Sequence, residues 1–421
     1  MPPRETSTLL VVALRQDRRS NPRDLFTRSR SWHYVHVLAL ILAAYLAGAG
    51  PALGTAGGLD YAPPPAAHGE WRSLVPTERP PNARERERMR EVAAVDWDRL
   101  QSAWDYNAMF PGNTGLLVVR RGWIVGEWYR GVGSESSFNI YSSSKSYLSV
   151  AFGLLLAEEA ARKSQDRLTL DTHVYTPAWL PEGLPLSDPR KKSITLRQLL
   201  TMTSGIPSHN DTGALPERAG PFEFALGLNP AWKTAQLASE PGTTFSYSNA
   251  SVSHLVLIHR RASGRDLRDY LKARLFDPIG MTHYDWVEEG GDGHIGPHRQ
   301  GYSGLLTTPR DHARFLYLAL HRGRWGGVQV VPADYYGWAL APTLNPEIGA
   351  LWYLAFVPGT PPDTFQTRGA KTNDGWVIPS LDLIVVRFCD GDRPPEGFNT
   401  ELLRRVQAAI LDRRPSDGES K

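Results

Sequence analysis

The 421-residue sequence contains a single cysteine, Cys389. One thiol excludes an intramolecular disulfide, a cysteine-based zinc cluster and an iron–sulfur site. It leaves the redox compartment open, because a protein without a thiol pair survives on either side of a membrane. The composition, with 41% hydrophobic and 22% charged residues, is that of a globular protein and excludes general disorder.

Lysine is scarce as well, with 8 lysines beside 39 arginines. Because lysine can lose its proton in a buried site and arginine cannot, each lysine is a candidate for chemistry. The formal net charge is +3, yet residues 1–32 alone hold seven arginines against three acidic residues. The remainder is nearly neutral, which excludes nucleic-acid binding by bulk charge for the main body.

The N-terminal region predicts export. An arginine-rich stretch that ends at Arg30 precedes the apolar segment Val37–Ala49, and the next charge after this segment is Asp60. This order is typical of a secretory signal peptide, although the same segment fits an uncleaved membrane anchor or a buried soluble helix. Either export outcome places the main body in the periplasm, free or anchored to the inner membrane.

The composition along the chain predicts one folded domain. Residues 1–59 are expected to be the signal peptide or anchor, and residues 60–91, rich first in proline and then in charge, predict a stiff linker or a solvated helix start rather than core. The domain then spans residues 92–412, and residues 413–421 form a polar tail.

Two β-hairpins are expected near opposite ends of this domain. The first joins residues 115–119 to 123–128, and the second joins residues 376–378 to 383–388. A helix is expected over residues 399–412, and mainly helical patterns lie between the hairpins. The economical architecture is an α/β fold in which both hairpins share one antiparallel sheet covered by helices, with an inserted, mostly helical lobe.

The strongest catalytic pattern starts at Ser142. Lys145 follows it by three residues, at the start of a stretch through Ala161 that is apolar on nearly every face and predicts a buried helix. Residues i and i+3 share a helix face, so the hydroxyl and the amine can meet. Burial and the helix dipole both favour a neutral amine, which would act as general base for the serine. A solvated helix start is the alternative interpretation.

Two later segments carry further candidate groups. Tyr247 and Asn249 lie in a loop before a helical stretch; the phenol could relay a proton, and the amide could orient Lys145 or bind a carbonyl. Lys371, Thr372 and Asn373 precede the strand at residue 376, where a backbone N–H could stabilise an oxyanion and the cation could bind a substrate carboxylate. Taken singly, Tyr247 fits a residue packed on a loop better than a catalytic one.

In this order the three motifs resemble the active-site set of serine β-lactamases and penicillin-binding peptidases. The Tyr247-x-Asn249 form is similar to class C β-lactamases and related esterases. The resemblance covers residues 114–411 and implies a three-layer α/β/α domain with a helical lobe, an acyl-enzyme mechanism, and no metal or cofactor. One departure is Asn373, which stands where the third motif of the family has glycine.

The sequence thus predicts an exported serine hydrolase that acts on a small amide, ester or peptide. Ser142 is the expected nucleophile, Lys145 its base and Tyr247 its assistant. Asn249 and the segment Lys371–Asn373 are the expected substrate and oxyanion contacts. The alternative is a non-catalytic protein that uses the same fold to bind a peptidoglycan peptide or a partner protein.

Overall fold

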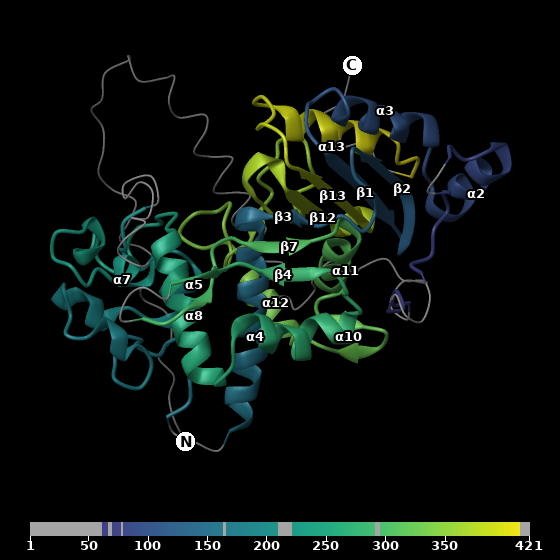
Figure 1. Ribbon diagram of the computed structural model, residues 1–421. Helices are drawn as coiled ribbons and strands as arrows, with labels where there is room; N and C mark the ends of the chain where they lie inside the picture. Colours follow the sequence, from purple (N-terminus) through teal and green to yellow (C-terminus); the bar gives the residue numbers. More distant parts are fainter. Residues whose placement is uncertain are drawn as a thin grey trace, which may run out of the picture. The chain divides into compact units, whose positions relative to one another are not determined.

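A six-stranded antiparallel sheet lies at the centre of the computed structural model, which describes residues 61–65, 70–76, 79–162, 166–208, 221–290 and 295–412 (Figure 1). The strand order is β10-β11-β12-β13-β1-β2. The strands are β1 (Thr114–Arg120), β2 (Trp123–Arg130), β10 (Tyr353–Leu354), β11 (Phe365–Thr367), β12 (Asp374–Ile378) and β13 (Leu383–Cys389). The predicted signal or anchor and the polar tail lie outside the described residues.

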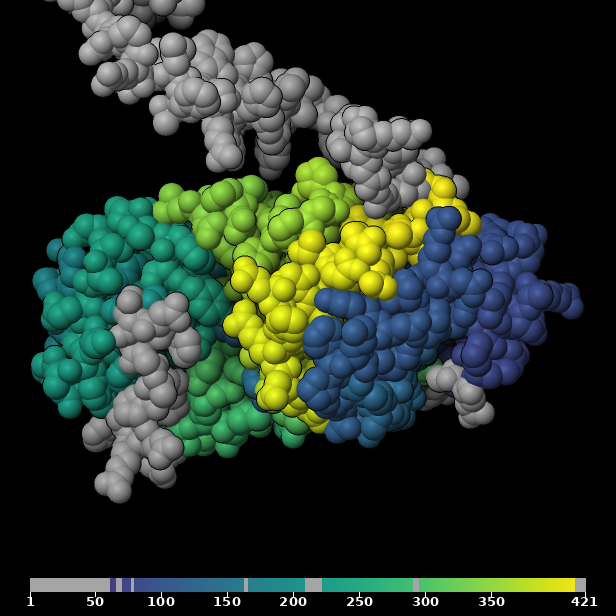
Figure 2. All heavy atoms as spheres, turned by 90° about the horizontal axis from the view of Figure 1, so that it is seen from above, coloured from purple at the N-terminus to yellow at the C-terminus, as the bar shows by residue number. Residues whose placement is uncertain are grey.

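The two predicted hairpins are confirmed, and the pairing of β1 with β13 joins them. Val118 lies opposite Val385 in this antiparallel register, and every residue of both strands is buried. Helices α3 (Trp97–Asn107) and α13 (Phe398–Ala408) cover one face of the sheet, and α11 (Pro309–Leu320) packs on the other (Figure 1). The expected three-layer α/β/α architecture is therefore confirmed. Figure 2 looks onto the face where the N-terminal and C-terminal parts of the domain lie side by side.

The inserted lobe is mostly helical, as expected. Its longest helices are α4 (Ser144–Ala161) and α8 (Asn249–Ser263), which pack on each other. Shorter elements complete this half of the domain: η2 (Tyr141–Ser143), η3 (Pro181–Gly183), η4 (Pro189–Ser193), α5 (Leu196–Leu200), α7 (Pro221–Leu226), η5 (Lys233–Ala235), α9 (Leu267–Leu271), η6 (Lys272–Phe276) and α10 (Asp277–Ile279).

Small sheets and one further helix connect the lobe to the main sheet. Strands β3 (Phe138–Asn139), β7 (Leu305–Thr307) and β4 (Tyr284–Trp286) form a three-stranded sheet beside the start of α4. The other elements are β5 (Glu288–Glu289), β6 (His298–Arg299), β8 (Arg324–Trp325), β9 (Val328–Gln329), α12 (Ala333–Ala339), η7 (Ala370–Thr372) and η8 (Pro379–Leu381).

Helix α4 matches the prediction of a buried helix, since its residues from Ser144 through Leu155 are all buried. The C-terminal helix is shorter than expected. Helix α13 ends at Ala408, because the chain then turns so that Ile410 pairs with Val95 in an isolated β-bridge.

A helix start was one of the two expectations for residues 60–91, but the prediction that this segment lies outside the core was wrong for its described part. Helix α2 (Ala83–Ala93) begins there with a capping box between Asn82 and Glu85, and Met89 is fully buried. Upstream, Trp71, Leu74 and Val75 belong to the core. The many charges of α2 lie on its solvent side and masked the narrow apolar stripe that packs on the domain.

Among the described residues, no helix is long and apolar enough to cross a membrane.

Candidate active site

The turn that carries Ser142 is held in place on three sides. Ser142 lies in η2, which runs directly into α4, so its backbone N–H is at the N-terminal end of a buried helix. Tyr141 has a positive φ of 48°, and its N–H donates to Asn139 Oδ1 at 2.8 Å. The hydroxyl of Ser144 donates to the Tyr141 carbonyl at 2.6 Å and accepts the Leu305 N–H at 3.1 Å. These bonds fix a strained backbone at the candidate nucleophile.

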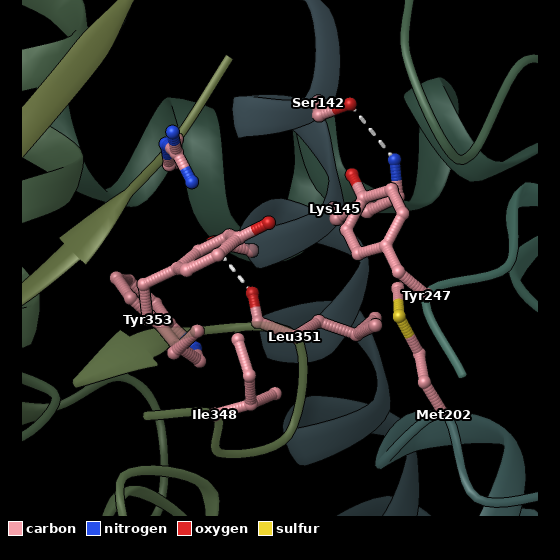
Figure 3. A pocket seen from close by; sticks show the side chains of 10 residues that line it. Ser142, Lys145, Met202, Tyr247, Ile348, Leu351 and Tyr353 are labelled. Atoms are coloured by element: carbon pink, nitrogen blue, oxygen red, sulfur yellow. Dashed lines mark hydrogen bonds between the residues drawn. The ribbon is translucent and has the colours of Figure 1, made fainter. Parts of the chain in front are cut away.

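Lys145 reaches back from the first turn of α4 to the serine. Its Nζ donates to Ser142 Oγ at 3.0 Å and to the Tyr302 carbonyl at 2.7 Å (Figure 3). The residue is only 3% exposed. Burial lowers the pKa of Lys145, and the charge and hydrogen bonding of Tyr247 offset this only in part. The amine is thus prepared to accept a proton.

Tyr247 faces the amine from the loop before α8. Its ring centroid lies 5.0 Å from Lys145 Nζ, and Ser248 next to it caps α8 by accepting the Ser251 N–H. Burial alone would raise the pKa of Tyr247, but the charge of Lys145 and the hydrogen bonds of its neighbours bring that pKa below its ordinary value. The amine and the phenol therefore compete for one proton, and the pair titrates as a unit.

The three groups open onto a narrow, mainly apolar cavity of about 10 Å³. Its lining residues are Ser142, Lys145, Ser146, Met202, Tyr247, Ile348, Leu351, Trp352, Tyr353 and Arg368. Figure 3 shows Ser142, Lys145 and Tyr247 turned toward one another, with Tyr353 on the opposite wall. This lining contains no carboxylate and no imidazole. Within the described residues at this cavity, the base available to Ser142 is therefore the amine and phenol pair.

The third predicted motif does not line this cavity. Lys371 Nζ donates instead to the Asp390 carbonyl at 2.7 Å, and the hydroxyl of Thr372 binds the Lys371 carbonyl and Arg387. Lys371 and Thr372 both have positive φ, at 60° and 59°, so the turn directs them differently from an extended strand. The expected contact between Lys371 and a substrate carboxylate therefore stays a prediction.

Asn373 is a structural residue. Its Nδ2 donates to the Asn139 carbonyl at 2.9 Å, its Oδ1 accepts the Cys389 N–H at 2.5 Å, and it is 1% exposed. Its own N–H donates to Ala370 O at 3.1 Å. The side chain of Asn373 is thus engaged within the protein, and an oxyanion contact near this residue stays a prediction. Asn249, the first residue of α8, is half-buried and likewise does not line the cavity.

The structure adds two residues that the sequence analysis missed, Arg368 and Tyr353. The Arg368 guanidinium lies 4.2 Å from the ring centroid of Phe356 and 5.5 Å from that of Tyr353. No ion pair of Arg368 with a carboxylate is found in the described part of the chain. Arg368 thus supplies the cation at this cavity. Neither residue stands in a motif, so only the pairing of β10 with β11 brings them here.

Fold and site together define a serine hydrolase of the three-layer α/β/α type, in which a lysine stands beside the serine. Residues 107–410 match the family model described as Beta-lactamase. The chain belongs to the β-lactamase family.

Known relatives of this chain include an esterase and a penicillin-binding protein homologue. The lovastatin esterase of Penicillium rubens is 30% identical over 102 residues, which are 23% of this chain and 25% of the esterase. The octameric penicillin-binding protein homologue from Pyrococcus abyssi is 18% identical, with a TM-score of 0.56 over 75% of this chain and 78% of that one.

A third relative is EstCE1, described as a hydrolase with promiscuous acyltransferase activity. It is 18% identical, with a TM-score of 0.54 over 75% of this chain and 98% of that one. At these identities the two structural matches show the shared fold. The chain spans less than half the length of the curated relatives that it matches.

Proposed function

We propose that this protein is an exported serine hydrolase that cleaves a small amide or ester through a covalent acyl-enzyme on Ser142. The observation that carries the proposal is the 3.0 Å contact between Ser142 Oγ and the buried Nζ of Lys145. An amine whose pKa is lowered by burial can remove the serine proton, and a phenol beside it can pass that proton on.

The reaction is written in two steps. In acylation, Ser142 Oγ bonds to the substrate carbonyl carbon, the bond from that carbon to the leaving nitrogen or oxygen breaks, and the serine proton moves through Lys145 and Tyr247 to the leaving group. In deacylation, water bonds to the same carbon, the bond from that carbon to Ser142 Oγ breaks, and a proton from the water passes through Lys145 and Tyr247 to Ser142 Oγ, which releases the acid. The backbone N–H of Ser142, at the N-terminal end of α4, stabilises the oxyanion.

The proposed substrate class is a small amide, ester or peptide whose carbonyl carbon can reach Ser142 Oγ. The proposal covers both esters and amides because an esterase and a penicillin-binding protein homologue are among the similar proteins. The nearly neutral main body gives no support to a nucleic-acid partner, and contact with a membrane is proposed only for the N-terminal segment.

Covalent labelling tests the acyl-enzyme. The protein is incubated with a fluorescent penicillin or a fluorophosphonate, and intact mass is measured for wild type, Ser142→Ala and the control Ser193→Ala, whose hydroxyl is exposed and remote. We expect an adduct on wild type and the control and none on Ser142→Ala. No adduct on wild type, or an adduct that persists in Ser142→Ala, contradicts the mechanism and favours a non-catalytic binding protein.

Export is tested by N-terminal sequencing of the protein from membrane and soluble fractions. A start near Gly50 means that the signal peptide is cleaved, and retention of Met1 in the membrane fraction means an anchor. Recovery of intact protein from the cytoplasm alone contradicts export.

A further inference from the structure

Lys145 has a second contact, a bond to a backbone carbonyl that belongs to a tight turn before β7. Its Nζ donates to the Tyr302 carbonyl at 2.7 Å, which is shorter than its 3.0 Å distance to Ser142 Oγ. A carbonyl oxygen can only accept a hydrogen bond, so it takes an N–H of the amine and never its lone pair. The lone pair of the neutral amine is thereby left for the serine hydroxyl.

A buried indole and close packing fix the backbone of this turn. Trp286 is 1% exposed, and its Nε1 donates to the carbonyls of Gln300 and Ser303, both at 2.9 Å. The turn also approaches α8 so closely that a Cβ on Gly301 would lie 2.2 Å from the Val256 side chain. The turn therefore has little room to move as a whole.

The side chain of Tyr302 anchors the same turn to strand β5. Its hydroxyl donates to both carboxylate oxygens of Glu289, at 2.9 and 3.0 Å, and accepts an N–H from Gln300 Nε2 at 2.9 Å. Gln300 Nε2 also donates to Glu289, so the three side chains form a closed ring of hydrogen bonds. Because tyrosine has only two side-chain torsions, a hydroxyl held at its far end restrains the backbone from which the ring projects.

Resting on the function proposed above, we propose that Tyr302 is a positioning residue, whose side chain, held by Glu289, keeps its own backbone carbonyl against Lys145 and the amine directed at Ser142. The Tyr302 ring centroid lies 5.8 Å from Lys145 Nζ, and the residue does not line the cavity. Tyr302 thus acts on the amine and not on the substrate. Displacing a catalytic group by about 1 Å can cost about a hundredfold in rate, so a loosened turn has a measurable effect.

The test is the steady-state rate of Tyr302→Phe, which keeps the ring and the backbone carbonyl and removes only the hydroxyl. We expect kcat for a nitrophenyl ester to fall about tenfold, because Lys145 is held less firmly. KM should stay unchanged, because Tyr302 does not contact the substrate. Rates are expressed per active site, counted by intact mass from the final fluorophosphonate adduct, so that misfolded protein is not counted as slow enzyme.

Two variants of Glu289 separate the hydrogen bond from the charge. Glu289→Ala removes the acceptor and should lose as much activity as Tyr302→Phe. Glu289→Gln keeps an acceptor oxygen and should retain most of the wild-type kcat. The matched control is Tyr129→Phe, which removes another phenol that donates to a carboxylate, that of Glu127 at 2.6 Å, outside the cavity lining. Its kcat should equal that of wild type.

The pH profile adds a readout that a loss of stability would not change. A carbonyl binds a charged donor more strongly than a neutral one, so the Tyr302 carbonyl favours the protonated amine. Loosening this carbonyl lowers the pKa of Lys145, and the acid limb of kcat/KM in Tyr302→Phe should move to lower pH while the plateau falls. The variant leaves unchanged the other polar groups around the amine, which are Ser142, Tyr247, Tyr353 and Arg368.

Three results overturn the inference: an unchanged kcat in Tyr302→Phe, a lower plateau with an unmoved acid limb, or a loss in Glu289→Gln as large as that in Glu289→Ala. If wild type forms no adduct and turns over no ester, the proposed function fails and this inference with it. Normal labelling and turnover of wild type together with an unchanged Tyr302→Phe refutes the role of Tyr302 alone.

Discussion

The Ser143 hydroxyl donates a 2.6 Å hydrogen bond to the backbone carbonyl of Asn373. This bond ties the residue after the candidate nucleophile to the turn before β12. Through its side chain Asn373 continues the link to the Asn139 carbonyl and the Cys389 N–H. The resemblance to the family predicts a glycine beside the substrate at this position. Asn373 instead forms a buried polar bracket, that is, a set of hydrogen bonds that connects the start of α4 to the sheet.

The substitution Asn373→Gly is therefore expected to destabilise the protein without improving catalysis. Two buried hydrogen bonds are lost and their partners are left unpaired, which costs about 2 to 4 kcal/mol in the free energy of unfolding. Asn373 has a φ of −78°, so the conformational freedom of glycine brings no relief of strain.

Urea denaturation measures this loss, with exposed Asn229→Gly as the control. A loss below about 0.5 kcal/mol, the range of ordinary surface substitutions, would show that the bracket is not structural.

Lys191 makes stability in the helical lobe depend on pH. Its fully buried Nζ donates to Ser187 Oγ and to the carbonyls of Leu226 and Thr234, at 2.8, 2.8 and 3.0 Å. Burial lowers the pKa of Lys191 from 10.5 to about 8. Between these two values the unfolded chain binds more protons than the folded protein, so the contribution of Lys191 to stability rises with pH.

We expect wild type to gain up to about 3 kcal/mol relative to Lys191→Met as the pH rises from 8 to 10.5, because the variant lacks this titration. Denaturation midpoints across this range measure the difference, and the variant of the exposed neighbour, Lys192→Met, serves as the control. A constant difference between wild type and Lys191→Met would mean that Lys191 titrates normally.

A structural feature could be predicted from the sequence where the residues that form it lie close together along the chain. The Ser142 and Lys145 pair was predictable because one helical turn sets their distance, and the hairpins because each pairs neighbouring segments. Arg368 and Tyr353 were missed, since their place depends on β10 and β11, which are short and leave little trace in the sequence. The contacts of Lys371 could not be predicted, because its positive φ is a property of the turn and is not readable from the residue type.

Arg368 is expected to select anionic substrates. The variant Arg368→Gln should raise KM about tenfold for a nitrophenyl ester whose acyl chain ends in a carboxylate, because a charge-assisted contact is lost. KM for the matched ester with a terminal methyl group should stay unchanged. Exposed Arg324→Gln on β8 is the control, and equal changes for both esters would show that Arg368 only shapes the cavity.

The antiparallel pairing of β1 with β13 also has a consequence for folding during synthesis. Strand β1 receives one of its two neighbours only from the far end of the chain, so the sheet cannot close while synthesis is still under way. The nascent polypeptide stays open until its last strands emerge. During that delay the apolar side chains of β1 are exposed, so the growing chain depends on the rapid arrival of β13 to bury them.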